Sequence, residues 1–284
     1  MWAYNDLICP YLGVFNPIAN ISFIIDRILM ILHPIQYFKW RHHYDYSSPG
    51  LVNLPCHVES FFPFARRRPS FNIYVPHTAR EDRRYPNIGF VSWDEATLLY
   101  NYGLRLRGKP VLEIGCWVGF STVVWALSGA VVTVIDPVLG GAPQGEACRD
   151  SLKRAGLLDK VELIPGFSPQ TTRNLANQGR KFTAFFVDGD HEGDAPLRDV
   201  MACIEAATDD CVILLHDLIL PNIAEALAWL CEQGWECGVH YTAQFIGVAW
   251  RGGVEVVKHV PDPRVDWSGL VHRRLPHLAD FRQI

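Results

Sequence analysis

The sequence lacks the cysteine spacing of a zinc site or a redox motif. Its eight cysteines include no Cys-x-x-Cys pair, which is the spacing that such sites use. Several cysteines fall within apolar stretches, where a free thiol behaves as a small buried hydrophobe. We therefore expect free thiols, no disulfide framework and a reducing, cytoplasmic location. The cysteines are Cys9, Cys56, Cys116, Cys148, Cys203, Cys211, Cys231 and Cys237.

A hydrophobic run long enough to cross a membrane is also missing. The most apolar stretch, residues 18–35, is interrupted by Asp26 and Arg27, and its uninterrupted part from Ile28 to Leu32 is far shorter than the ~20 residues of a span. Apolar residues recur there at helical spacing, which predicts an amphipathic helix packed on the protein's own core or on a second copy in a homodimer. The alternative is a helix lying in a membrane surface. Asp6 stands where a signal peptide would carry positive charge.

An excess of positive charge is absent as well. The chain has 26 Lys and Arg against 30 Asp and Glu, a net charge of −4. A nucleic-acid surface needs clustered basic residues, so we expect no nucleic-acid partner. The basic run at residues 66–68 lies among prolines and is typical of a solvated loop.

The character of the chain changes near residue 85. Before it, prolines, aromatic residues and histidines follow one another without a regular period, which predicts an irregular or helical N-terminal extension that serves as a lid or a dimerisation segment. After it, short β-branched runs alternate with helical patterns. We predict an extension at 1–85, a main domain at 86–252 and a C-terminal tail at 253–284.

The main domain is predicted to be a doubly wound α/β unit. Strands that are apolar throughout and alternate with helices indicate a parallel sheet covered on both faces. Together with a terminal antiparallel hairpin, the pattern predicts a mostly parallel, seven-stranded Rossmann-like sheet. Ligands of such sheets bind beyond the carboxyl ends of the strands. The predicted strands are 110–115, 131–135, 161–164, 182–187, 211–215, 235–240 and 245–250.

A glycine-containing loop follows the strand at 110–115. Gly115 and Gly119 let the backbone turn sharply and approach a ligand, and a helix opens directly after them. Trp117 stands where dinucleotide-binding loops carry their middle glycine. Asp136 ends the next strand, where an acid can accept hydrogen bonds from a ribose. The loop with its acid predicts a nucleotide-like cofactor.

Several segments carry a family resemblance. They resemble the class I S-adenosylmethionine-dependent methyltransferases, and among them the O-methyltransferases of small molecules and natural products. The segments are Gly89 to Ser92, Glu95 and Ala96, Leu98 to Tyr100, Val111 to Thr122, Phe186 to His191 and Leu214 to Asp217. The resemblance covers about residues 86–250 and is absent before about residue 85.

The resemblance implies S-adenosylmethionine as cofactor and a hydroxyl of a sugar or other small molecule as methyl acceptor. It implies that the glycine loop wraps the methionine part and that Asp136 holds the ribose. Many relatives have an acid beside the adenine; here stacking by Phe167 and a hydrogen bond from Ser168 are the expected substitutes. The cofactor-binding residues are then Glu113, Gly115, Cys116, Trp117, Gly119, Ser121, Thr122, Asp136, Phe167, Ser168 and Asp188.

The resemblance also implies a place for a divalent metal such as Mg or Mn, held by Asp188, His216 and Asp217. The family prefers Asp-Asp or Asp-Asn at the last pair, and a histidine suits a softer metal than magnesium. The other interpretation is a hydrogen-bonded structural network beneath the substrate. A hydroxyl acceptor needs a base, and histidine works near neutral pH. We assign this role to His191, with His216 second and Asp188 as a further catalytic residue.

Two other functions remain open at this stage. A nicotinamide oxidoreductase can use a similar sheet, but its glycine spacing differs from the one here. A non-catalytic S-adenosylmethionine-binding or scaffold protein would keep Glu113, Gly115, Gly119 and Asp136 without turnover.

Overall fold

The computed structural model describes residues 45–71 and 75–284. The amphipathic helix predicted within residues 18–35, and with it the predicted dimer contact, lies outside these residues. Among the described residues, no helix is both long enough and apolar enough to cross a membrane.

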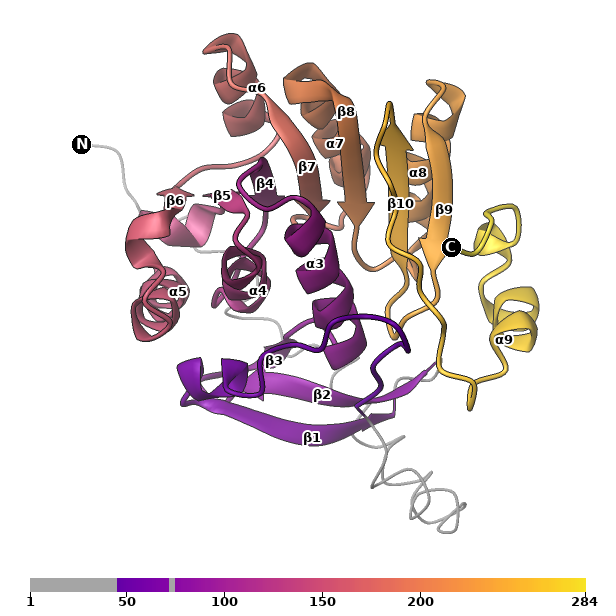
Figure 1. Cartoon of the computed structure of the whole chain (residues 1–284), viewed down its shortest axis with the longest axis horizontal. Coiled ribbons are helices and arrows are strands. Elements are labelled where there is room, and N and C mark those ends of the chain that lie inside the picture. The colour runs from indigo at the N-terminus through magenta and orange to yellow at the C-terminus, as the bar shows by residue number, and fades with distance from the viewer. Residues whose placement is uncertain (1–44, 72–74) are drawn as a thin grey trace. The chain divides into compact units, whose positions relative to one another are not determined.

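A seven-stranded sheet forms the centre of the described unit (Figure 1). Its order is β6-β5-β4-β7-β8-β10-β9, and only β10 runs antiparallel to its neighbours on both sides. This confirms the predicted doubly wound sheet with its terminal hairpin. The strands are β4 (Pro110–Ile114), β5 (Val131–Ile135), β6 (Val161–Ile164), β7 (Phe182–Val187), β8 (Ala207–Leu215), β9 (Glu236–His240) and β10 (Ile246–Arg251).

Helices cover both faces of this sheet, because its strands are apolar on both sides. Val111 of β4 packs in the core beneath α3 and α4, whereas Leu112 packs in the opposite core beneath α7 and α8. This alternation follows from the two-residue period of a strand. The helices are α3 (Trp93–Arg105), α4 (Phe120–Ser128), α5 (Pro143–Arg154), α6 (Gln170–Asn177), α7 (Ala195–Ala206), α8 (Pro221–Glu232) and α9 (Trp267–Arg274).

A reciprocal pair of hydrogen bonds fixes the start of α3. The Ser92 hydroxyl accepts from the Glu95 amide at 3.3 Å, and the Glu95 carboxylate accepts from the Ser92 amide at 2.7 Å. This capping box satisfies two amides that the helix itself leaves without partners. It makes Ser92 the N-cap residue of α3.

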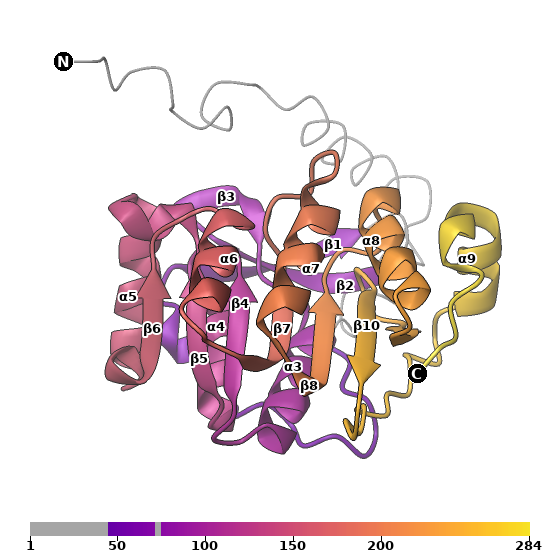
Figure 2. The same cartoon turned by 90° about the horizontal axis from the view of Figure 1, so that it is seen from above.

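A second, three-stranded antiparallel sheet occupies part of the predicted irregular extension. It consists of β1 (Ala65–Phe71), β2 (Pro76–Asp82) and β3 (Tyr85–Gly89). In Figures 1 and 2 it lies beyond the carboxyl ends of the parallel strands, and Phe90, just after β3, stacks on Phe120 at the start of α4 with ring centroids 4.8 Å apart.

The basic run at 66–68 lies in β1 rather than in the predicted loop. Arg66 and Arg67 remain about half exposed, in ion pairs with Glu81 and Glu59. Charged residues on the strand hide the apolar alternation by which a strand is recognised, and this is why the prediction of a loop was wrong.

The C-terminal tail packs on the main sheet. Leu270 and Val271 of α9 are buried in the same core as α8. The ring nitrogen Nε2 of His277 lies 3.0 Å from the carbonyl oxygen of Leu218, just after β8. The tail therefore packs against the segment that follows the carboxyl end of β8.

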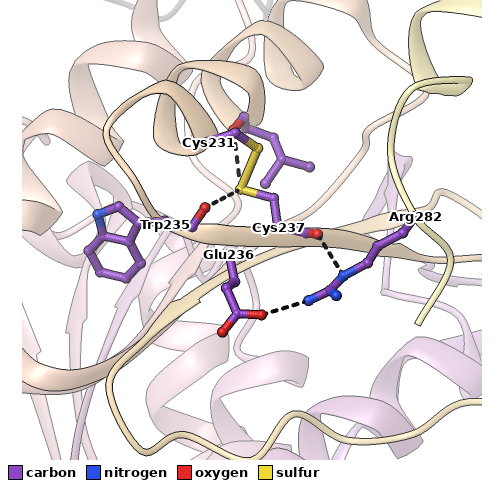
Figure 3. Close-up of a disulfide and its surroundings, with 6 residues drawn as sticks. Cys231, Trp235, Glu236, Cys237 and Arg282 are labelled. Carbon is purple, nitrogen blue, oxygen red and sulfur yellow. Dashed lines mark hydrogen bonds and ion pairs between the residues drawn. A yellow bond between two sulfur atoms is a disulfide. The ribbon is translucent and has the colours of Figure 1, made fainter.

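One cysteine pair departs from the free-thiol prediction (Figure 3). Cys231 at the end of α8 and Cys237 in β9 form a disulfide, with Cα atoms 5.9 Å apart. The tight turn between helix and strand brings these cysteines into the range that a disulfide requires, although their six-residue separation matches no common motif. Cys56 is exposed and free, and Cys116, Cys148, Cys203 and Cys211 are buried free thiols as predicted.

The core packing yields a stability prediction. Leu98 of α3 is fully buried, so L98A should lower the free energy of unfolding by about 2–5 kcal/mol through lost contacts and a new cavity. Urea denaturation measures this change. Val131 is 52% exposed, and V131A should stay within about 0.5 kcal/mol of the original protein. Equal losses in the two variants would contradict the assigned core.

Candidate active site

The glycine loop turns directly from β4 into α4. Gly115 has φ +86° and Gly119, which caps α4, has φ +87°. A Cβ atom on Gly115 would lie 2.1 Å from the carbonyl oxygen of Asp188. Only glycine therefore allows the loop to pass this close to the end of β7, while tolerating the left-handed conformation.

Asp136 anchors this loop from the end of β5. Its Oδ2 atom accepts hydrogen bonds from the amides of Cys116 and Trp117 at 2.7 and 3.0 Å, and its Oδ1 atom accepts from Val138 at 2.9 Å. The carboxylate thus lies beside the glycine loop, where the sequence places it. Its contact with a ribose stays a prediction.

Two polar groups at the loop, the Glu113 carboxyl and the Trp117 indole nitrogen, are buried. Burial raises the pKa of Glu113 to about 8, more than the nearby hydroxyls of Ser121 and Thr122 lower it. The indole nitrogen Nε1 of Trp117 is buried and has no hydrogen-bond partner among the described residues. An unpaired buried donor at a glycine loop fits a site that takes a polar ligand.

The predicted adenine residues follow β6. Phe167 is 71% exposed, so one face of its ring is available for stacking. The Ser168 hydroxyl lies 3.0 Å from the Thr172 hydroxyl. Their adenine contacts remain predictions.

A cluster of acids and histidines follows β7 and β8. His216 Nδ1 lies 3.1 Å from Asp188 Oδ1 and 3.5 Å from Asp217 Oδ2. His191 Nε2 lies 3.5 Å from Asp188 Oδ1, and His191 Nδ1 lies 3.5 Å from Asp217 Oδ2. The structure thus brings together all four residues to which the sequence analysis gave catalytic or metal-binding roles.

Three residues of this cluster could share a cation. Donor atoms of Asp188, His191 and Asp217 all lie within 4.8 Å of one another. This group contains His191 in place of His216 of the predicted set. The second nitrogen of His216, Nε2, faces Glu95 Oε2 at 3.4 Å instead. Two carboxylates and an imidazole suit Mn²⁺ and similar ions better than Mg²⁺.

The charges of the cluster depend on one another. Burial disfavours the charged form of His216, but Asp188, Asp217 and Glu95 together raise its pKa well above the usual range. Burial likewise opposes ionisation of Asp188, yet the two histidines hold its pKa well below the usual value. The same opposition, with His216 as the largest favourable partner, lowers the pKa of Glu95 to about 2. His216 is therefore enclosed by carboxylates that favour its charged form.

His191 differs from His216 in its exposure. Its side chain is 28% exposed, against 8% for His216. Burial lowers the pKa of His191, but hydrogen bonding and charge from Asp188, together with Asp217, raise it above the ordinary value. Of the two histidines, His191 is therefore the more exposed one.

Two residues of this region have contacts that the sequence does not predict. Asn222 at the start of α8 donates its Nδ2 hydrogens to the carbonyl oxygens of His191 at 2.6 Å and Gly193 at 3.1 Å. Glu95 of α3 is fully buried against His216, although the family resemblance around it implied no role in the site. Only the tertiary fold reveals these contacts, because they join segments far apart in the chain.

Comparison with known proteins agrees with this geometry. Residues 112–218 match a family model described as a methyltransferase domain. The chain is 33% identical over 115 residues to the catechol O-methyltransferase of Mycobacterium tuberculosis. The aligned residues make up 40% of this chain and 50% of that protein. The chain thus spans about half the length of this curated relative.

A solved methyltransferase structure shares the fold. The SAH-bound methyltransferase of Podospora anserina superposes with a TM-score of 0.55 at 16% identity, covering 72% of this chain and 91% of that one. An O-methyltransferase of Bacillus cereus in complex with SAH gives 0.49 at 16% identity, covering 55% and 80%.

The sheet order and the glycine loop define a domain of the class I methyltransferase type. Residues 112–218 match the model of a methyltransferase domain, in agreement with the S-adenosylmethionine-dependent class that the sequence resembles. The family prediction is confirmed, whereas the roles of single site residues stay predictions.

The close approach at Gly115 can be tested by calorimetry. G115A should weaken the binding of S-adenosylmethionine by at least about tenfold, because the added Cβ must displace the backbone at Asp188. Gly50 has the same φ of +86° with nothing within 4 Å of an added Cβ. The control G50A therefore introduces backbone strain without a steric clash, and its affinity for S-adenosylmethionine should not change. Unchanged affinity in G115A would show that the loop does not contact the cofactor.

Proposed function

We propose that this protein transfers the methyl group of S-adenosylmethionine to a hydroxyl oxygen of a small molecule, such as a sugar or a natural product. One observation carries the proposal: the glycine loop and the acid–histidine cluster meet at Gly115 and Asp188. A methyl donor held by the loop would lie beside groups that can bind and deprotonate an acceptor. Methyl transfer requires mainly such alignment in a site that excludes water.

The cofactor roles follow from the position of each side chain. The loop from Gly115 to Gly119 would wrap the methionine part, with the Trp117 indole as an additional donor. Asp136 would hold the ribose, and Phe167 and Ser168 would lie against the adenine. The SAH found in the Podospora anserina structure supports this choice of cofactor.

The donor set Asp188, His191 and Asp217 fits a divalent cation. Such a cation would lower the pKa of a bound hydroxyl and orient the acceptor. The name of the Mycobacterium tuberculosis relative makes catechol a suitable probe acceptor. The competing interpretation is a metal-independent network in which His191 alone removes the proton.

Metal removal distinguishes these two interpretations. If the cluster binds a cation, chelation should abolish methyl transfer to catechol, and Mn²⁺ should restore it, because the acceptor loses the group that lowers its pKa. Transfer is measured with S-adenosylmethionine labelled in its methyl group. Full activity in the chelated protein would leave the metal-free network as the mechanism.

In the metal-independent interpretation His191 is the general base, because it is the more exposed histidine and His216 is enclosed by carboxylates. H191A should lower turnover of labelled methyl onto catechol about 10²- to 10⁴-fold, the usual contribution of a general base. Its affinity for S-adenosylmethionine, measured by calorimetry, should not change.

Near-normal turnover in H191A would remove His191 from the mechanism. Binding of S-adenosylmethionine without methyl transfer to any hydroxylated acceptor would favour the non-catalytic alternative. Binding of NAD in place of S-adenosylmethionine would favour the oxidoreductase.

A further inference from the structure

We propose that Glu95 is a positioning residue for the active site: through the His216 ring, it fixes the carboxylate of Asp188 beside the glycine loop. This inference rests on the proposed function for its catalytic readout. Glu95 is fully buried with its carboxylate facing His216, and it lies outside the family-matched residues 112–218.

The Glu95 carboxylate is itself firmly held. It is fully buried in the first turn of α3. Its Oε1 atom accepts hydrogen bonds from the Thr242 hydroxyl at 2.9 Å and the Gln244 amide at 2.7 Å. Its Oε2 atom accepts from the Ser92 amide at 2.7 Å. Contacts from the start of α3 and from the β9–β10 connection thus determine where this carboxylate points.

The oxygen that caps α3 is also the one that faces His216. Glu95 Oε2 lies 3.4 Å from His216 Nε2, while the opposite ring nitrogen lies 3.1 Å from Asp188 Oδ1. The ring is thus held between two carboxylates, one at each nitrogen. A ring flipped about its Cβ–Cγ bond would lose both contacts, so this pair of acids selects one ring orientation.

The orientation of His216 matters because of where Asp188 lies. The backbone of Asp188 contacts the glycine loop at Gly115, and its carboxylate also contacts His191. A side chain anchored on one side by His216 has less freedom to move away from the donor. Small displacements of such groups have large effects on rate, up to about 10²-fold for 1 Å.

The variant E95Q tests this role with little change of shape. Glutamine retains the length of the side chain and an oxygen for capping α3, but removes the negative charge facing His216. Its amide nitrogen cannot accept the hydrogen bonds that Thr242 and Gln244 donate to Oε1. The matched control is T242V, which deletes one hydrogen bond to Glu95 Oε1 and leaves Oε2 in place. If E95Q does not fold, E95D retains the charge and withdraws it from His216 by one methylene.

The first readout needs no acceptor. The ring nitrogens of His216, observed by ¹⁵N NMR and assigned with H216N, should shift in E95Q and stay in place in T242V. Calorimetry should give the same affinity for S-adenosylmethionine, within about twofold, in the original protein, E95Q and T242V. Unshifted His216 signals in folded E95Q, or in E95D, would overturn the proposal.

The second readout is methyl transfer to catechol. We expect kcat to fall about tenfold or more in E95Q, with the KM for S-adenosylmethionine unchanged and T242V near normal. In an H216N background, E95Q should cause no further loss, because its effect passes through the ring.

Equal losses in E95Q and T242V, or additive losses in the double variant, would show a merely structural role. Absence of methyl transfer in the unchanged protein would contradict the proposed function, while the NMR result would still decide the positioning role.

Discussion

The close approach of two parallel strand ends is the constraint on which the site depends. Ile114 of β4 pairs with Val187 of β7, and the next residue on each strand, Gly115 and Asp188, would collide if Gly115 had a side chain. The loop that turns into α4 and the acid that begins the cluster are therefore placed together by one backbone contact. The roles proposed for the surrounding side chains follow from this juxtaposition.

The cluster also illustrates how burial and charge act together. Asp188 and Glu95 would be costly to ionise in isolation, and His216 would be costly to protonate. Together they stabilise one another's charged forms, so that an acid-rich site can be enclosed by protein. Such arrangements are costly to break from one side, because the partner is left buried and unpaired.

The sequence predicted most of the main sheet because its strands are short apolar runs separated by turns. The loop at Gly115 and the acid at Asp136 were likewise placed correctly, since their positions relative to the strands follow from the βαβ arrangement. Strand β1 was missed because its arginines conceal the alternation, and the Cys231–Cys237 pair because no spacing rule covers it. Glu95 and Asn222 could not be assigned, because their contacts join segments far apart in the chain.

The capping box of α3 has a consequence for how this protein tolerates change. The carboxylate that begins the helix by accepting from Ser92 is the same carboxylate that faces His216. Uncharged replacements of Glu95 that leave the Ser92 hydroxyl to cap the helix would still remove the charge behind the histidine. Position 95 would therefore be under two constraints, the start of the helix and the proposed support of the site, although it lies before the residues 112–218 that match the family model.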